Sequence, residues 1–199
     1  MPIPDPIVRD LNGQRRDLAW LASYWGVPLD IQRADPHPAC PHLFRLTEIA
    51  IRQGPAVQIV ACLQADGSPY HRTAVARWWQ DAPALPPYPD DCHATRWKPN
   101  AVIGWTDAAG VVGFGMGGGD RPGSSGVWPL HCEAPGDWVG NLGMHAERNH
   151  ETLALTFQLM PANEPPPEPP EPPASGDLAA IAQAIHALNA TLRQALRLD

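Results

Sequence analysis

The chain has 199 residues and a mass of 21.6 kDa, which suits one domain of ordinary size with an appendage and is too little for a large multidomain enzyme. Charged residues make up only 18% of it, and 25 prolines with 17 glycines exceed a fifth of the chain, so much of it is loop, turn or linker. The net charge of -7, with Lys98 as the only lysine, argues against nucleic acid as the main partner, because phosphate neutralisation needs a basic face.

The first 43 residues are predicted to form a turn and helix that cap the body of the protein, followed by an extended, proline-rich segment, the strap. In DLNGQRRDLAWLASYWG a turn precedes a short helix that ends at Gly26. Its apolar side carries Leu18, Leu21 and Trp25, with Trp20 as a further candidate. The following VPLDIQRADPHPACPH contains too many prolines for anything except an extended segment on the surface.

Residues 44–160 are predicted to form an antiparallel β-sandwich. LTEIAIRQ at 46–53 is compatible with an edge strand or a helical turn, and we favour the edge strand. AVQIVACLQ at 56–64 and TAVARWW at 73–79 favour a hairpin across the ADGSP turn. The runs AVIGWT, VVGFGM, GVWPLHCE and TLALTFQLM predict further strands, and the last alternates apolar residues with period two. Short strands separated by turn signals are typical of a sandwich, and the absence of strand–helix repeats weighs against a Rossmann-like or barrel enzyme.

Residues 161–176, PANEPPPEPPEPPASG, are predicted to form a linker. Eight prolines fall within thirteen positions, separated by acidic residues, so this segment extends as a semi-rigid polyproline II spacer. A PxxP ligand for an aromatic groove is the alternative, although the basic residues that usually orient such ligands are missing.

Residues 177–199 are predicted to form an amphipathic helix with Asp177 as its N-cap. Its apolar seam predicts an oligomerisation helix: Leu178, Ile181, Ile185, Leu188 and Leu192. Leu and Ile mixed at these positions favour a trimeric or tetrameric coiled coil over a dimer. Docking of the helix on the body and a frayed tail are the alternatives.

Tryptophan is the most informative residue type, with eight in the chain. Trp78 and Trp79 are adjacent in a predicted strand, so they face opposite sides and one of them should reach solvent. Exposed indoles stack on sugar rings, whereas the alternative places each indole in the core. The predicted ligand-binding residues are five tryptophans with polar neighbours: Trp78, Trp97, Trp105, Trp128, Trp138, Asp120 and Arg121, with Asp137 as a further polar candidate.

The four cysteines are widely spaced and form no CxxC pair. Cys40 and Cys92 lie in proline-rich loops and are candidates for a disulfide. Cys62 and Cys132 lie in apolar runs, which predicts buried thiols. Cysteine usage alone therefore does not assign a compartment.

We predict no metal, no cofactor and no catalytic residue. His131, His145 and His150 are candidates to approach one another, but neither a HExxH nor a paired-cysteine pattern accompanies them. Ser124 and Ser125 lie outside any G-x-S-x-G elbow, and GFGMGGGD lacks the GK[ST] ending of a phosphate loop.

The start of the chain, MPIPDPIVRDLNG, lacks the basic-then-apolar order of a secretory signal. No stretch approaches the roughly 20 apolar residues that span a bilayer. We therefore expect a soluble chain without a signal peptide and without membrane insertion.

Two turns carry a family resemblance. Asp66-Gly67-Ser68-Pro69 ends a predicted strand, and TDAAG at 106–110 leads into VVGFGM. Prealbumin-like β-sandwich modules have a D-G-x-P turn and a T-D-x-x-G turn at these two positions. The chain thus resembles carboxypeptidase-regulatory-like and collagen-adhesin B-type repeats, and residues 54–160 look like accessory modules of bacterial extracellular and cell-wall-associated proteins. One departure is Tyr70-His71-Arg72, which replaces the family's glycine-rich turn.

The resemblance implies a non-catalytic module outside the cell. Together with the tryptophans and the C-terminal seam, it predicts a multivalent binding module for a cell-surface glycan or a protein partner. A structural subunit of a fibre, appendage or phage-like particle is the second hypothesis, and a hydrolase of unknown type is the third.

Overall fold

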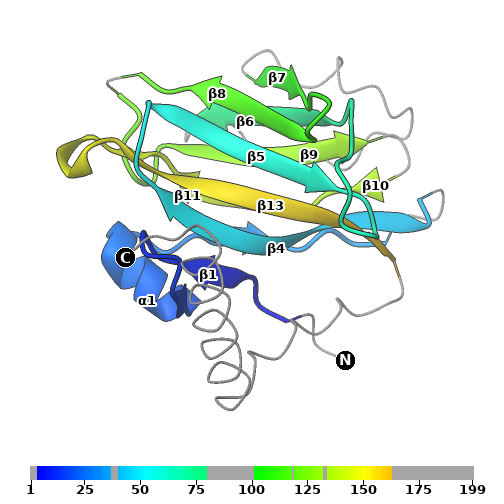
Figure 1. Ribbon diagram of the computed structural model, residues 1–199, viewed down its shortest axis with the longest axis horizontal. Helices are drawn as coiled ribbons and strands as arrows, with labels where there is room; N and C mark the ends of the chain where they lie inside the picture. The colour runs from blue at the N-terminus through cyan, green and yellow to red at the C-terminus, as the bar shows by residue number, and fades with distance from the viewer. Residues whose placement is uncertain (1–3, 37–39, 80–100, 118, 132–133, 163–199) are drawn as a thin grey trace, which may run out of the picture. The chain divides into compact units, whose positions relative to one another are not determined.

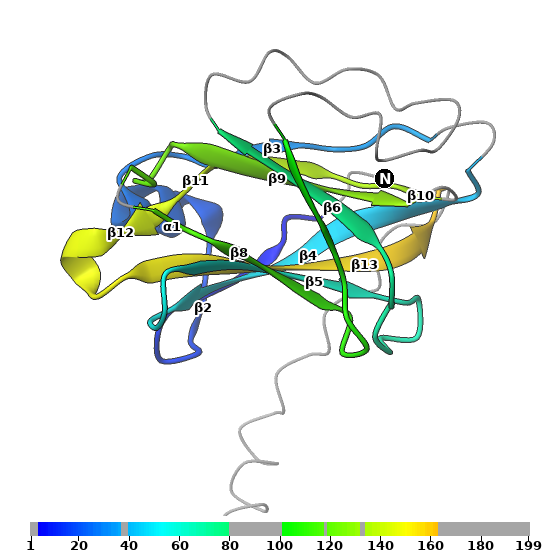
Figure 2. The ribbon, with the colours of Figure 1, turned by 90° about the horizontal axis from the view of Figure 1, so that it is seen from above.

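The computed structural model describes residues 4–36, 40–79, 101–117, 119–131 and 134–162, which all belong to one compact unit, Met1–Pro166. This unit is mainly β and consists of two facing sheets with one helix at one end (Figures 1 and 2). The predicted helix 177–199 and nearly all of the predicted linker lie outside the described residues.

The first sheet has the strand order β2-β1-β4-β13-β5-β8, and β12 pairs with the start of β13. The bounds of its strands are β1 (Ile7–Arg9), β2 (Arg15–Arg16), β4 (His42–Arg52), β5 (Val57–Leu63), β8 (Val111–Gly115), β12 (Met144–His145) and β13 (Glu151–Pro161). A short 3-10 helix, Ala146–Arg148, connects β12 to β13.

The second sheet has the order β3-β11-β9-β6-β7, and β10 pairs with β9. All of its pairs are antiparallel. The bounds of its strands are β3 (Asp30–Gln32), β6 (Ala74–Trp79), β7 (Val102–Trp105), β9 (Ser125–His131), β10 (Ala134–Pro135) and β11 (Trp138–Leu142).

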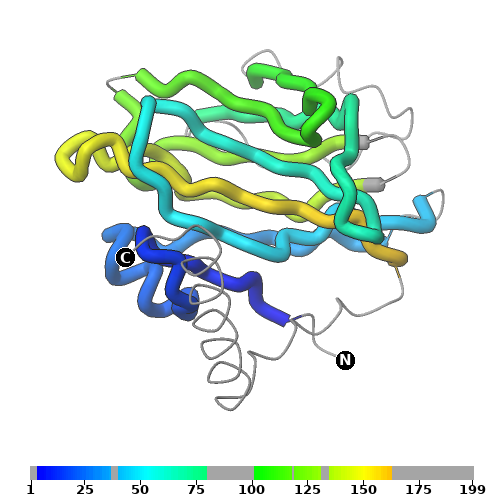
Figure 3. The backbone as a smooth tube through the Cα atoms, viewed as in Figure 1, coloured from blue at the N-terminus to red at the C-terminus, as the bar shows by residue number. Residues whose placement is uncertain are grey.

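The first sheet is mixed, which corrects the prediction of a purely antiparallel sandwich. β13 lies between β4 and β5, as the tube in Figure 3 shows. It is antiparallel to β4 but parallel to β5. Because β4 and β5 are consecutive strands that run in opposite directions, a strand inserted between them must be parallel to one of them. β1 adds a second parallel pair on the far side of β4.

The predicted hairpin between 56–64 and 73–79 is wrong, because β5 and β6 belong to different sheets. The Asp66-Gly67 turn folds back onto β5 itself, where Tyr70 N–H donates to Cys62 O at 2.9 Å. The chain then passes through Arg72, whose φ of 61° lies in the left-handed region, and enters the second sheet. The turn is therefore local to β5 and does not join it to β6.

Helix α1 (Leu18–Trp25) confirms the prediction for the N-terminal region. The Asp17 side chain accepts a hydrogen bond from Trp20 N–H at 2.6 Å, which caps the helix. Gly26, with a φ of 82°, ends it in the left-handed conformation that favours glycine. Leu21 and Trp25 are buried, so the predicted apolar side faces the core.

The first 43 residues also supply strands to both sheets, beyond their predicted role as cap and strap. β1 pairs with β4, and β3 pairs with β11. Residues 46–53 are a strand as predicted, but β4 lies inside the sheet and not at its edge, because β1 covers its outer side.

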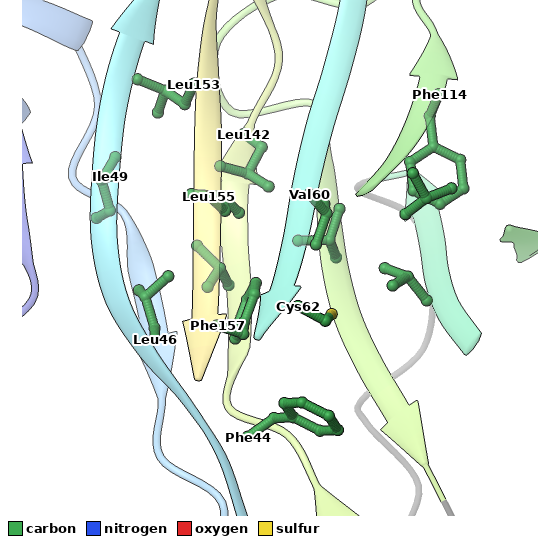
Figure 4. Close-up of a cluster of buried hydrophobic side chains, with 14 of the residues drawn as sticks. Phe44, Leu46, Ile49, Val60, Cys62, Phe114, Leu142, Leu153, Leu155 and Phe157 are labelled. Atoms are coloured by element: carbon green, nitrogen blue, oxygen red, sulfur yellow. The ribbon is translucent and has the colours of Figure 1, made fainter. Parts of the chain in front are cut away.

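The main hydrophobic core lies between the sheets. Side chains from β4, β5, β8 and β13 meet side chains from β6, β9 and β11 there, and Figure 4 labels residues of the first sheet together with Leu142 of β11. The fully buried members include Phe44, Ile49, Val60, Leu155 and Phe157. Burial of such side chains stabilises the fold by about 1.5–3 kcal/mol each.

Candidate functional site

The structure describes every tryptophan except Trp97, which lies outside the described residues. Trp25, Trp78 and Trp128 are buried, whereas Trp79 is 40% exposed and Trp105 is 55% exposed. The adjacent pair thus divides as its strand position predicts, with Trp78 covered and Trp79 reaching solvent.

Trp78, Trp128 and Trp138 belong to a second apolar cluster on the outer face of the second sheet. The residues next to them along the chain, such as Val127 and Val139, point into the main core, so these indoles point the other way. Trp78 stacks on Trp138 with ring centroids 5.8 Å apart and meets Trp128 edge-on at 6.5 Å. These three indoles contact one another, and two of them are too buried to stack on a ligand.

Trp79 is the exposed indole with a fixed orientation. Its Nε1–H donates to Asp120 Oδ1 at 3.2 Å, and the Arg77 guanidinium carbon lies 4.9 Å from the ring centroid. Arg77 and Asp120 are themselves buried. A surface indole is thereby held by two interior side chains, so it loses little conformational freedom when a ligand stacks on it.

Asp120 ties the glycine-rich loop to β6. Its Oδ1 also accepts from Arg77 Nη2 at 2.6 Å, and its Oδ2 accepts from Gly117 N–H at 2.6 Å. Met144 N–H donates to the carbonyl of Asp120 at 3.1 Å. The predicted polar ligand contact Asp120 therefore positions Trp79 and Arg77, and Arg121, the next residue in the chain, is exposed.

Gly143 permits the close approach that holds this loop. Its φ is 151°, and an added Cβ would lie 1.9 Å from the Arg121 carbonyl oxygen. Any side chain at position 143 would therefore displace the loop that carries Asp120.

Polar groups lie behind the Trp79 indole. Ser125 faces Trp79 across the β6–β9 pair, and its hydroxyl is buried with no hydrogen-bond partner in the described part of the chain. Arg77 Nε is also buried without a hydrogen-bond partner in this part of the chain. Arg77 Nη1 donates to Gly115 O at 3.0 Å, so the Arg77 side chain bridges the two sheets. The side chains next to the Trp79 indole are therefore polar, and Trp79 does not belong to either hydrophobic cluster.

Asp137, the further polar candidate, has a structural role. It is fully buried, and its carboxylate accepts from Arg33 Nη1 at 2.6 Å and from Arg45 Nη1 at 2.8 Å. The backbone N–H groups of Ala34 and Leu46 donate to it at 2.9 Å. Asp137 therefore fastens the strap after β3 to β4, with no exposed atom for a ligand.

The histidines are used locally. His145 Nε2 lies 2.9 Å from the carbonyl oxygen of Trp25, and its ring meets the Trp25 indole edge-on. His150 Nδ1 lies 3.4 Å from Met144 Sδ. Within the described ranges no group of three or more His, Cys, Asp or Glu side chains is arranged to hold a metal ion.

Two cysteines are described, and both are buried. Burial raises the pKa of the Cys62 thiol, so it stays protonated. Cys92 lies outside the described residues, and the Cys40–Cys92 disulfide stays a prediction.

The sequence predicted only part of the site around Trp79. The strand alternation at 78–79 indicates one exposed indole, but the predicted ligand-binding set names Trp78 and omits Trp79. Arg77 was not predicted either, because an arginine in a β-strand carries no signal that it will pair with a loop carboxylate 43 positions later.

Comparison of the chain with protein-family models, with curated proteins and with solved structures finds no match. The prealbumin-like resemblance therefore remains a prediction. In the described residues no helix is long and apolar enough to cross a membrane.

Proposed function

We propose that this protein is a non-catalytic β-sandwich module that binds a cell-surface glycan on the Trp79 indole. The observation that carries the proposal is the combination of 40% exposure at Trp79 with its anchoring by the buried Arg77–Asp120 pair.

The chemistry of the surroundings suits a sugar. The indole face offers an apolar plane for the C–H groups of a pyranose ring, and Arg121 offers hydrogen-bond donors for hydroxyl or carboxylate oxygens. One stacked ring gives weak binding, because a small ligand gains only a limited free energy per atom.

The predicted helix 177–199 supplies the second part of the proposal. A trimer or tetramer repeats the weak site on several arms and raises the effective concentration of each arm once the first has bound. Display outside the cell, as the family resemblance implies, is part of the same proposal.

Replacing Trp79 with Ala removes the stacking plane and lowers the affinity for glycan at least about tenfold. The measurement is depletion of the full-length protein from solution by insoluble cell-wall and polysaccharide preparations. Leu11→Ala is the matched control, because it removes an apolar side chain of similar exposure, 42%, from the turn between β1 and β2 and leaves depletion unchanged. Equal depletion of wild type and Trp79→Ala, or no depletion of wild type by any preparation, would refute the proposal.

A structural subunit of a larger assembly is the second candidate. Val102 and Trp105, at the two ends of the edge strand β7, are 48% and 55% exposed, and an exposed apolar edge favours contact with another protein.

A further inference from the structure

The four strands at the sheet edges differ in how they are protected. β2 has only two residues, Arg15–Arg16, and β3 carries Asp30. β8 is protected by neighbours: Asp107 bonds both the N–H and the C=O of Val111, and Arg77 bonds Gly115 O. β7 has no charge and no proline, and within the described ranges no strand covers its free side.

The hydrogen-bonding groups on the free side of β7 follow from the ladder with β6. Thr106 N–H donates to Thr73 O, and Thr106 O accepts from Arg72 N–H, so Thr106 turns both groups toward the β6 side. Orientation alternates along an antiparallel strand, so Gly104 also faces β6. Ile103 and Trp105 therefore direct their N–H and C=O groups to the free edge.

The side chains of these two residues share one face. Trp105 lies opposite Ala74 and Ile103 lies opposite Ala76, and both alanines belong to the apolar cluster on the outer face of the second sheet. The free edge thus combines open backbone groups with an exposed indole and a half-buried isoleucine beside it.

We propose that β7 pairs with β7 of a second copy of this chain, antiparallel about a two-fold axis at Gly104. In this register Ile103 lies opposite Trp105 of the partner subunit, and each such pair exchanges both of its N–H···O=C bonds. The exposed Trp105 indole then packs on Ile103 of the partner subunit, on the outer face of a sheet that continues through both copies.

Charge favours β7 over β2 and β3 as the site of self-association. The chain carries a net charge of -7, so two copies repel each other at most approaches. Val102–Trp105 contains no charged residue, whereas self-pairing of β2 would bring four arginines together and self-pairing of β3 would oppose two aspartates. β8 is also uncharged, but Asp107 and Arg77 already bond backbone groups on its free side, so β7 is the uncharged edge that is left for a second copy.

The edge is short, so the dimer is weak and depends on concentration. A four-residue strand buries far less than the roughly 1,200 Å² of a stable interface. The association through β7 is therefore expected to appear as a rise of the average mass with concentration, above the mass that a coiled coil of residues 177–199 sets by itself.

Sedimentation equilibrium of the full chain over a wide concentration range tests the proposal. Trp105→Lys places a like charge on each side of the two-fold axis, removes the indole contact and raises the dissociation constant at least about tenfold. Leu11→Lys is the matched control, since Leu11 is 42% exposed on the turn between β1 and β2, and its mass curve follows the wild type. A wild-type mass that does not rise with concentration, or a Trp105→Lys curve equal to that of the wild type, would overturn the proposal.

Cross-linking tests the register itself. Cysteines placed opposite each other in a hydrogen-bonded antiparallel pair have Cα atoms about 5.5 Å apart, within disulfide range. A mixture of Ile103→Cys and Trp105→Cys chains is expected to form a mixed disulfide dimer, while Trp105→Cys alone forms much less. Equal cross-linking in both samples contradicts the register. Trp79→Ala leaves the association unchanged, so failure of glycan binding and failure of this contact are separate results.

Discussion

Replacing Asp137 with Ala lowers the free energy of unfolding by about 3–5 kcal/mol, because it leaves charged arginines without their buried partner. The side chains of Arg45 and Asp137 are 8% and 0% exposed, so water does not replace the lost contact with Arg45. Leu46 N–H also loses its acceptor. Urea unfolding followed by circular dichroism measures the change.

Two control variants separate the loss of the Asp137 contacts from the effect on the unfolding free energy of replacing any aspartate near the strap. Asp35 lies two residues beyond Arg33 and is exposed, so Asp35→Ala changes the unfolding free energy by less than about 0.5 kcal/mol. Asp137→Asn keeps the shape of the side chain but removes its charge, so its loss of unfolding free energy lies between those of Asp35→Ala and Asp137→Ala. An Asp137→Ala variant as stable as Asp35→Ala would show that the strap is not fastened through this carboxylate.

Replacing Asp120 with Ala has a comparable effect on stability and an additional effect on binding. Arg77 keeps only its bond to Gly115 O, and a buried arginine without its carboxylate costs about 3–5 kcal/mol. Trp79 loses the acceptor for its Nε1–H, so the indole is no longer held in one orientation. We expect both a lower unfolding midpoint and weaker glycan binding at a temperature where the variant is folded.

Asp120→Asn distinguishes the two effects. The amide oxygen of Asn still accepts from the Trp79 indole, while the ion pair with Arg77 is lost. Stability therefore falls, and glycan affinity stays closer to that of the wild type than in Asp120→Ala. If Asp120→Ala binds glycan as tightly as the wild type, the orientation of Trp79 does not matter for binding.

Much of the fold could be predicted from local patterns. Helix α1 was predictable because its cap residues, Asp17 and Gly26, act within a few positions. The strand at 151–161 was predictable because its alternation is regular. The partner of each strand was not predictable, because β13 inserts between two strands a hundred positions earlier, and no local signal specifies that insertion. β11 was missed because Gly140 and Asn141 interrupt its apolar pattern.

The site was less predictable than the fold. Tryptophan content pointed to an aromatic surface, but which indole is exposed depends on which face of the second sheet is covered. Trp78 and Trp128 were assigned to ligand binding and are buried in the outer-face cluster. Trp79 is exposed because its strand position points it over the polar Arg77–Asp120 pair, which only the three-dimensional arrangement brings together.

The most direct test of Trp79 as the binding platform is a saccharide titration followed by the indole N–H resonances in a ¹H–¹⁵N NMR spectrum. Each tryptophan gives one indole signal, and the Trp79→Ala spectrum identifies that of Trp79. Soluble cell-wall fragments are expected to shift the Trp79 signal most and to leave those of the buried Trp25 and Trp128 unchanged. A titration that shifts other indole signals while that of Trp79 stays fixed, or that shifts none, would contradict the account.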